Sequence, residues 1–115
     1  MTITLYGIPN CDTVKKARKW LDERGTAYTF YDYKKAGADP ERLAAWCEAL
    51  GWDKVLNRAG TTFRKLPEEQ REGLDQARAI ALMVENPSCI KRPIVEYPGG
   101  ILLGFREGEW TALQG

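Results

Sequence analysis

Apolar positions in the first third of the chain follow two different periodicities. Residues 2–6 and 28–33 are short runs rich in the β-branched and aromatic residues that favour strands. Between them, residues 12–24 carry an apolar stripe at i, i+3 and i+7, which predicts one buried helix face. The stripe consists of Val14, Ala17 and Leu21. A strand, a helix and a second strand of these lengths form a βαβ unit, in which the two strands are parallel.

A block of helical segments follows at about residues 39–85. Asp39 and Pro40 suit the N-cap and the first position of a helix, which we expect to end at Gly51. Its apolar stripe comprises Leu43, Trp46, Cys47 and Leu50. Shorter helical segments are expected at 52–58, from a cap at Thr61 or Thr62 to Leu66, and from Pro67 onward.

The final third of the chain combines one more helix with a hairpin. Asp75 is expected to cap the helix, because its carboxylate can accept hydrogen bonds from the first-turn N–H groups. The face predicted to be buried consists of Ala77, Ile80, Ala81 and Val84. Residues 93–97 and 100–104 flank Pro98-Gly99, which predicts an antiparallel hairpin. Residues 106–113 are expected to form a short closing helix.

The order of these elements predicts the fold class. It is βαβ, then a helical insertion between the second and third strands, then ββα. This is the order of an α/β, thioredoxin-like fold with a four-stranded mixed sheet. With 115 residues, the chain is expected to form one domain, residues 1–115, with the insertion at about 39–85.

Charge and composition exclude several classes of function. Seventeen basic and sixteen acidic residues leave a net charge of +1, so nucleic acid is not an expected partner. The chain has no apolar run of membrane-spanning length and no signal-peptide pattern at its start, which predicts a cytoplasmic protein without a membrane partner. There is no histidine, and the three cysteines lack the spacing of a zinc site, so we expect no metal.

Cys11 is the leading candidate for chemistry. It lies where the first strand ends and the helix at Asp12 or Thr13 begins, facing free N–H groups that favour a thiolate. Lys15 adds positive charge in the first turns of the helix, and Asn10 and Thr13 are candidate loop contacts. Turn formation and helix capping are the alternative roles of Asn10 and Thr13.

The other two cysteines have different expected roles. Cys47 belongs to an apolar helix stripe and is expected to be structural. Cys89 precedes the segment Lys91-Arg92-Pro93, so a disulfide with Cys11 remains an alternative to a structural role. Because the chain has no C-x-x-C, we expect Cys11 to work with an external thiol.

Two motifs resemble the ArsC/Spx family, which contains glutaredoxin-coupled arsenate reductases and Spx-type transcription regulators. They are Gly-Ile-Pro-Asn-Cys-Asp-Thr-Val-Lys-Lys-Ala at 7–17 and Lys-Arg-Pro-Ile-Val at 91–95. The likeness runs along almost the whole chain and is strongest to the YffB branch. It implies that Cys11 is the nucleophile and that Arg58, Arg92 and Arg106 contact an anion. It also implies a cis peptide bond before Pro93, beside the thiol.

The chain departs from the family pattern at two positions. Asp12 follows the cysteine directly, where a small residue would suit an oxyanion, and its carboxylate is expected to repel arsenate. A carboxylate there can also cap the helix. Val14 occupies the second position of the C-x-x-C by which Spx regulators sense disulfide stress, so that switch is excluded.

The function that these residues and the resemblance imply is a glutathione-dependent thiol or oxyanion reductase. Cys11 would attack a small anionic or disulfide substrate, and glutathione, with glutaredoxin as a further partner, would release the product. Glutathione is then a co-substrate, and no bound cofactor is expected. The alternatives are an Spx-like adaptor that binds RNA polymerase and a retained fold without catalysis.

Overall fold

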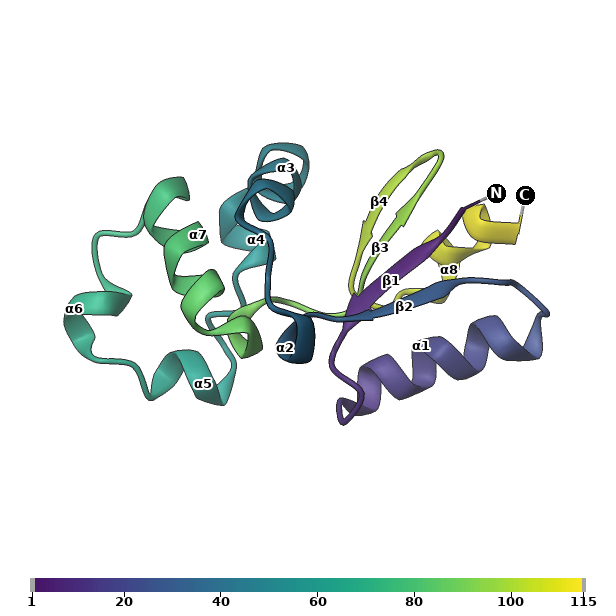
Figure 1. Ribbon diagram of the computed structural model, residues 1–115, viewed down its shortest axis with the longest axis horizontal. Helices are drawn as coiled ribbons and strands as arrows, with labels where there is room; N and C mark the ends of the chain where they lie inside the picture. The colour runs from purple at the N-terminus through teal and green to yellow at the C-terminus, as the bar shows by residue number, and fades with distance from the viewer. Residues whose placement is uncertain (1, 115) are drawn as a thin grey trace. The chain divides into compact units, whose positions relative to one another are not determined.

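Four strands form a mixed sheet in the computed structural model, which describes residues 2–114 (Figure 1). They are β1 (Thr4–Gly7), β2 (Thr29–Asp32), β3 (Ile94–Tyr97) and β4 (Gly100–Leu103), in the spatial order β2-β1-β3-β4. β2 runs parallel to β1, whereas the β1–β3 and β3–β4 pairs are antiparallel. The predicted four-stranded mixed sheet of an α/β, thioredoxin-like fold is confirmed.

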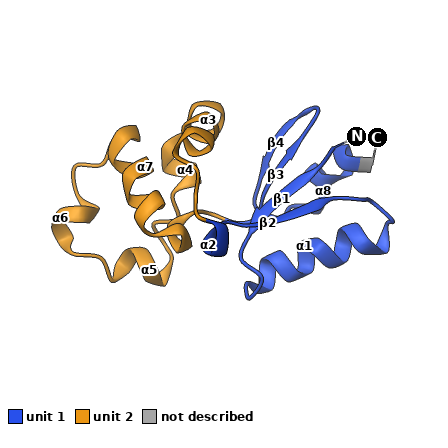
Figure 2. Ribbon diagram, in the orientation of Figure 1, with its two compact units in different colours: residues 1–36, 92–115 blue, residues 37–91 orange. Residues whose placement is uncertain are grey.

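The chain divides into two compact units, coloured separately in Figure 2. We call residues 1–36 with 92–115 the sheet unit, because they contain all four strands, and residues 37–91 the helical unit. The helical unit corresponds to the insertion expected at about 39–85. That the whole chain forms one domain stays a prediction. None of the helices in the described part of the chain has the length and apolar character needed to span a bilayer.

The core of the sheet unit forms where helices pack on one face of the sheet. The predicted stripe of α1 (Asp12–Glu23) is buried together with Trp20, against Leu5 of β1 and Val95 of β3. α8 (Glu107–Trp110) and the 3-10 helix η2 (Thr111–Gln114) add Trp110 and Leu113 to the same cluster. This packing fixes α1 against the sheet, and with it the residue that precedes the helix.

The second strand ends one residue earlier than expected, because the chain turns into a helix at Tyr33. The Asp32 carboxylate accepts hydrogen bonds from the backbone N–H groups of Lys34 (3.0 Å) and Lys35 (3.2 Å). These bonds stabilise the single turn α2 (Tyr33–Ala36) instead of an extended chain. The prediction that Tyr33 belongs to the strand is therefore wrong.

The helical unit contains the expected caps. Its elements are α3 (Pro40–Leu50), α4 (Trp52–Val55), α5 (Thr61–Arg64), α6 (Glu68–Arg71), α7 (Gln76–Glu85) and the 3-10 helix η1 (Pro87–Cys89). Asp39 accepts from the Glu41 N–H at 3.0 Å, and Asp75 from the Arg78 N–H at 2.8 Å. Both predicted N-caps are confirmed.

Three other expectations for the helical unit are wrong. α5 has Gly60, not a threonine, at its N-cap. α4 ends at Val55, because Leu56 becomes extended and pairs with Ile90 in an isolated antiparallel bridge. The buried residues of α7 are Ala79, Leu82 and Met83 instead of the predicted stripe. Both stripes of this mostly apolar helix have helical spacing, and packing against α3 and α4 decides between them.

A prediction concerns Gly7, where β1 ends against α1. A Cβ atom at this position would lie 2.9 Å from Cγ2 of Val14, whose side chain is fully buried. We expect Gly7→Ala to lower the free energy of unfolding by about 1–3 kcal/mol, measured by urea denaturation. Gly108→Ala is the matched control, because a Cβ there meets nothing within 4 Å. Equal stability of the two variants would contradict the expected close packing.

Candidate active site

Three segments of the sheet unit meet at one edge of the sheet. β1 ends at Gly7, which pairs with Asp32 at the end of β2, so the loop to Cys11 and the start of α2 leave the same edge. β3 is antiparallel to β1 and begins opposite Tyr6, which brings the preceding residues, Arg92 and Pro93, to that edge as well. The topology therefore brings Cys11, Tyr33 and Arg92 close together in space, although the chain separates them widely.

Cys11 is itself the N-cap residue of α1. Its backbone is extended (φ −91°, ψ 126°), its N–H donates to the carbonyl of Ile8 at 3.2 Å, and its carbonyl accepts from the Lys15 N–H at 2.9 Å. The predicted helix start at Asp12 is confirmed. The expectation that Asp12 caps the helix is wrong, because Asp12 is exposed within the first turn.

The sulfur of Cys11 accepts hydrogen bonds from two kinds of donor. The backbone N–H groups of Val14 and Thr13 belong to the first turn of α1, and the third donor is the guanidinium of Arg92. Partial burial raises the pKa of the Cys11 thiol, but these hydrogen bonds and the positive charge of Arg92 outweigh it. The pKa of Cys11 therefore lies below its ordinary value, which favours the nucleophilic thiolate.

Arg92 links Cys11 to a residue that sequence analysis did not select. Its guanidinium is hydrogen-bonded to both the Cys11 sulfur and the Tyr33 hydroxyl. Burial alone would lower the pKa of Arg92, but these partners raise it above its ordinary value, so the guanidinium stays charged. Tyr33 lies near Cys11 because β1 and β2 are parallel. The residue that follows β2 is therefore at the same edge of the sheet as the residues that follow β1.

Pro93 lies beside this cluster. The Arg92–Pro93 peptide bond is cis, as the family resemblance implies. Pro93 is buried, and its carbonyl accepts from the Gly104 N–H at 2.8 Å, which ties the start of β3 to the end of β4. The expected contact of Pro93 with substrate or glutathione stays a prediction.

Other candidate residues lie on the surface of the sheet unit. Asn10, Thr13 and Lys15 have exposed side chains at the start of α1. Thr13 contributes to the sulfur site through its backbone N–H. Arg106 is the N-cap residue of α8, with a side chain 76% exposed and 4.0 Å from the carboxylate of Glu109.

The helical unit holds the remaining candidates. Arg58 is exposed, and its guanidinium lies 5.7 Å from the ring centroid of Trp52. Cys47 and Cys89 are not joined in a disulfide and are 2% and 1% exposed, and burial raises the pKa of Cys47. A buried thiol with a raised pKa is a poor nucleophile, which agrees with the structural role expected of Cys47.

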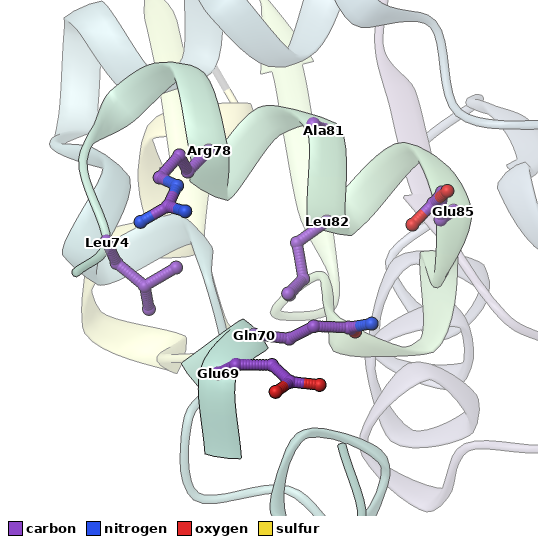
Figure 3. Close-up of a pocket in the computed structure, with 7 residues that line it drawn as sticks. All are labelled: Glu69, Gln70, Leu74, Arg78, Ala81, Leu82 and Glu85. Atoms are coloured by element: carbon purple, nitrogen blue, oxygen red, sulfur yellow. The ribbon is translucent and has the colours of Figure 1, made fainter. Parts of the chain in front are cut away.

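Metal-ligating groups and one pocket of the helical unit bear on where the candidate site lies. Among residues 2–114, no group of three or more histidine, cysteine or acidic side chains could hold a metal ion. A pocket of about 240 Å³ lies between α6 and α7 of the helical unit (Figure 3). Leu74 and Leu82 contribute apolar surface to it, and Glu69, Arg78 and Glu85 contribute charge. None of the residues predicted for chemistry lines this pocket.

Comparison with known proteins identifies the family. The family model described as "ArsC family" matches residues 6–113, which is most of the chain. The chain belongs to the ArsC family.

Relatives of this ArsC-family chain include solved structures and curated sequences. A structure of a protein named YffB is 55% identical and covers 98% of this chain and 99% of its own, with a TM-score of 0.94. An arsenate reductase-related protein from Brucella melitensis is 51% identical, covering 97% and 93%, with a TM-score of 0.77. A Haemophilus influenzae protein is 44% identical over 96% of both chains. The global transcriptional regulator Spx of Listeria innocua is 29% identical, over 93% of this chain and 82% of the regulator.

A prediction concerns the ionisation of Cys11 in this ArsC-family chain. Iodoacetamide reacts with the thiolate, so its rate rises with pH through the pKa of the thiol, and we expect a midpoint below that of free cysteine. Arg92→Gln removes a donor and a positive charge, so the midpoint should rise by about one pH unit.

Arg18→Gln is the matched control, because it removes the same charge from a residue that bonds the Tyr28 hydroxyl at 3.1 Å. It should leave the midpoint unchanged. Cys11→Ser supplies the background rate from the two buried thiols. If the Arg92→Gln and wild-type profiles coincide, the guanidinium does not stabilise the thiolate.

Proposed function

We propose that this protein is a cytoplasmic, glutathione-linked thiol reductase in which Cys11 is the single nucleophile. The observation that carries the proposal is the sulfur at the start of α1, held by two backbone N–H groups and the Arg92 guanidinium. Membership of the ArsC family and the arsenate reductase-related neighbour support a reductase. Glutathione is the proposed co-substrate, glutaredoxin a further partner, and no bound prosthetic group takes part.

The proposed reaction consists of two thiol–disulfide exchanges. The Cys11 thiolate attacks the glutathione sulfur of a mixed disulfide, forming a Cys11–glutathione disulfide and expelling the substrate thiolate, which takes a proton from water. A second glutathione, as thiolate, then attacks the glutathione sulfur of that disulfide, releasing glutathione disulfide and the Cys11 thiolate. In sum, the mixed disulfide bond of the substrate breaks and the disulfide bond of oxidised glutathione forms, so the substrate sulfur is reduced and the sulfur of the entering glutathione is oxidised, by one electron each.

The environment of Cys11 favours a disulfide over an oxyanion as substrate. The N–H groups of Thr13 and Val14, which a helix start can offer to an oxyanion, are already donated to the Cys11 sulfur. Asp12 adds an exposed negative charge next to the thiol.

The proposed contacts for the carboxylates of glutathione are Arg58, Arg92 and Arg106, because a guanidinium matches a carboxylate with two parallel hydrogen bonds. The backbone at Pro93 and the polar groups of Asn10, Thr13 and Lys15 complete the proposed contact set.

The first test of this function is a mixed disulfide on Cys11. Reduced protein treated with oxidised glutathione should gain one glutathionyl group, located on Cys11 by peptide mass spectrometry, and added glutathione should remove it. Cys11→Ser should abolish the product, whereas a Cys47→Ser, Cys89→Ser double variant should retain it, since both of those thiols are buried.

Two results would redirect the proposal. An unmodified Cys11 with the alkylation midpoint of free cysteine would favour a retained fold without catalysis. Stoichiometric capture of RNA polymerase by the Cys11→Ser variant would favour the second candidate, an Spx-like adaptor, which the similarity to the Listeria regulator supports. Val14, at the position of the regulator's second cysteine, is 0% exposed, so an adaptor of this kind would act without that thiol switch.

A further prediction separates the effect of Asp12 on anionic and neutral substrates. Asp12→Asn removes a negative charge beside the thiolate, so glutathionylation by oxidised glutathione should become about two- to threefold faster at low salt. The rate with the neutral 2-hydroxyethyl disulfide should change much less. Equal acceleration of both reactions would show that Asp12 acts on the thiol rather than on the substrate's charge.

A further inference from the structure

Tyr33 is the buried residue of an otherwise exposed helical turn. Its side chain is 1% exposed, whereas Lys34, Lys35 and Ala36, which complete α2, are exposed. The Asp32 carboxylate holds the turn through the N–H groups of Lys34 and Lys35. α2 also packs against β1 and β2. The Tyr33 ring is therefore held rigidly at the sheet edge from which the Cys11 loop departs.

The hydroxyl of Tyr33 contacts the guanidinium that serves Cys11. Arg92 is hydrogen-bonded to the Tyr33 side chain and to the Cys11 sulfur at once. A guanidinium has five N–H donors in one plane and no acceptor, so the tyrosine oxygen is the acceptor of this bond. Because the guanidinium is planar, a hydrogen bond that fixes one of its edges also fixes the direction of its other N–H groups. The contact with Tyr33 thereby limits how far the guanidinium can turn away from the sulfur.

The chemical type of this acceptor matters as much as its position. Burial raises the pKa of the Tyr33 hydroxyl well above its ordinary value, so the side chain stays neutral at physiological pH. A carboxylate at the same place would hold the guanidinium equally well, but it would neutralise the charge that stabilises the thiolate. A neutral hydroxyl orients Arg92 and leaves its full positive charge for Cys11.

We propose that Tyr33 is a positioning residue, which acts on Cys11 by orienting the Arg92 guanidinium toward its sulfur. The proposal rests on the proposed function in one respect, namely that the Cys11 thiolate is the reacting group. It assigns Tyr33 no contact with substrate and no proton transfer. A role in packing alone would predict that the hydroxyl can be removed without changing the ionisation of Cys11.

The test compares Tyr33→Phe with Tyr6→Phe. Both substitutions remove one hydroxyl from a buried tyrosine of the sheet unit, but the Tyr6 hydroxyl donates to the Glu96 carboxylate at 2.8 Å. We expect Tyr33→Phe to raise the pH midpoint of Cys11 alkylation by about half to one unit, which lowers the rate near pH 7 about three- to tenfold. Tyr6→Phe should leave the midpoint unchanged. Urea denaturation of each variant separates this effect from loss of fold.

A double variant tests whether Tyr33 acts through Arg92. In the Arg92→Gln background, Tyr33→Phe should add no further shift of the midpoint, because the group that it orients is absent. A full additional shift there would mean that Tyr33 acts on Cys11 directly, and it would overturn the proposal. A wild-type midpoint in the single Tyr33→Phe variant would overturn it as well.

A measurement on the wild-type protein tests the orientation of Arg92 without the Tyr33→Phe variant. Nitrogen NMR of the arginine side chains, with Arg92 assigned from the Arg92→Gln spectrum, should show slow rotation of its guanidinium and resolved terminal N–H signals. Averaged signals, like those of the exposed arginines, would contradict an oriented guanidinium. Alkylation and NMR do not use glutathione, so failure of this proposal is distinguishable from failure to form the mixed disulfide.

Discussion

The Cys11 thiolate depends on hydrogen bonds from its own helix and from one arginine far along the chain. The Val14 and Thr13 N–H groups come from the helix that Cys11 begins, and the Arg92 guanidinium comes from the residue before the cis Pro93. Burial opposes ionisation, so the thiolate is favoured only while these donors stay in place. The chain has no histidine to act as a base, which leaves this arrangement as the means of activating the thiol.

The sheet keeps the donors in place. Parallel pairing of β1 with β2 and antiparallel pairing of β1 with β3 bring three connections to one edge. Packing of α1 on Leu5 and Val95 fixes the helix start relative to that edge. Tyr33 completes the arrangement, because it supplies Arg92 with a neutral acceptor where a carboxylate would cancel its charge. The reactivity of one sulfur is thus a property of the topology as well as of its immediate neighbours.

Predictions from local signals succeeded where one segment determines the outcome. Asp39 and Asp75 cap their helices because capping involves only residues two or three positions away. The buried face of α7 was mispredicted, because two apolar stripes were available and neighbouring helices selected one of them. Tyr33 was mispredicted for a related reason. Its aromatic ring suits a strand, but the Asp32 carboxylate starts a helical turn there.

By itself, the sequence determined the order of strands and helices, the position of Cys11 at a helix start and the family motif around it. These features depend on periodicity, capping and turn residues that lie close together in the chain. Tertiary structure decided which groups contact the sulfur. Arg92 was expected from the family motif, but its hydrogen bond to Tyr33 arises only when β1, β2 and β3 pair. Contacts between residues far apart in the chain depend on strand pairing, which no single segment encodes.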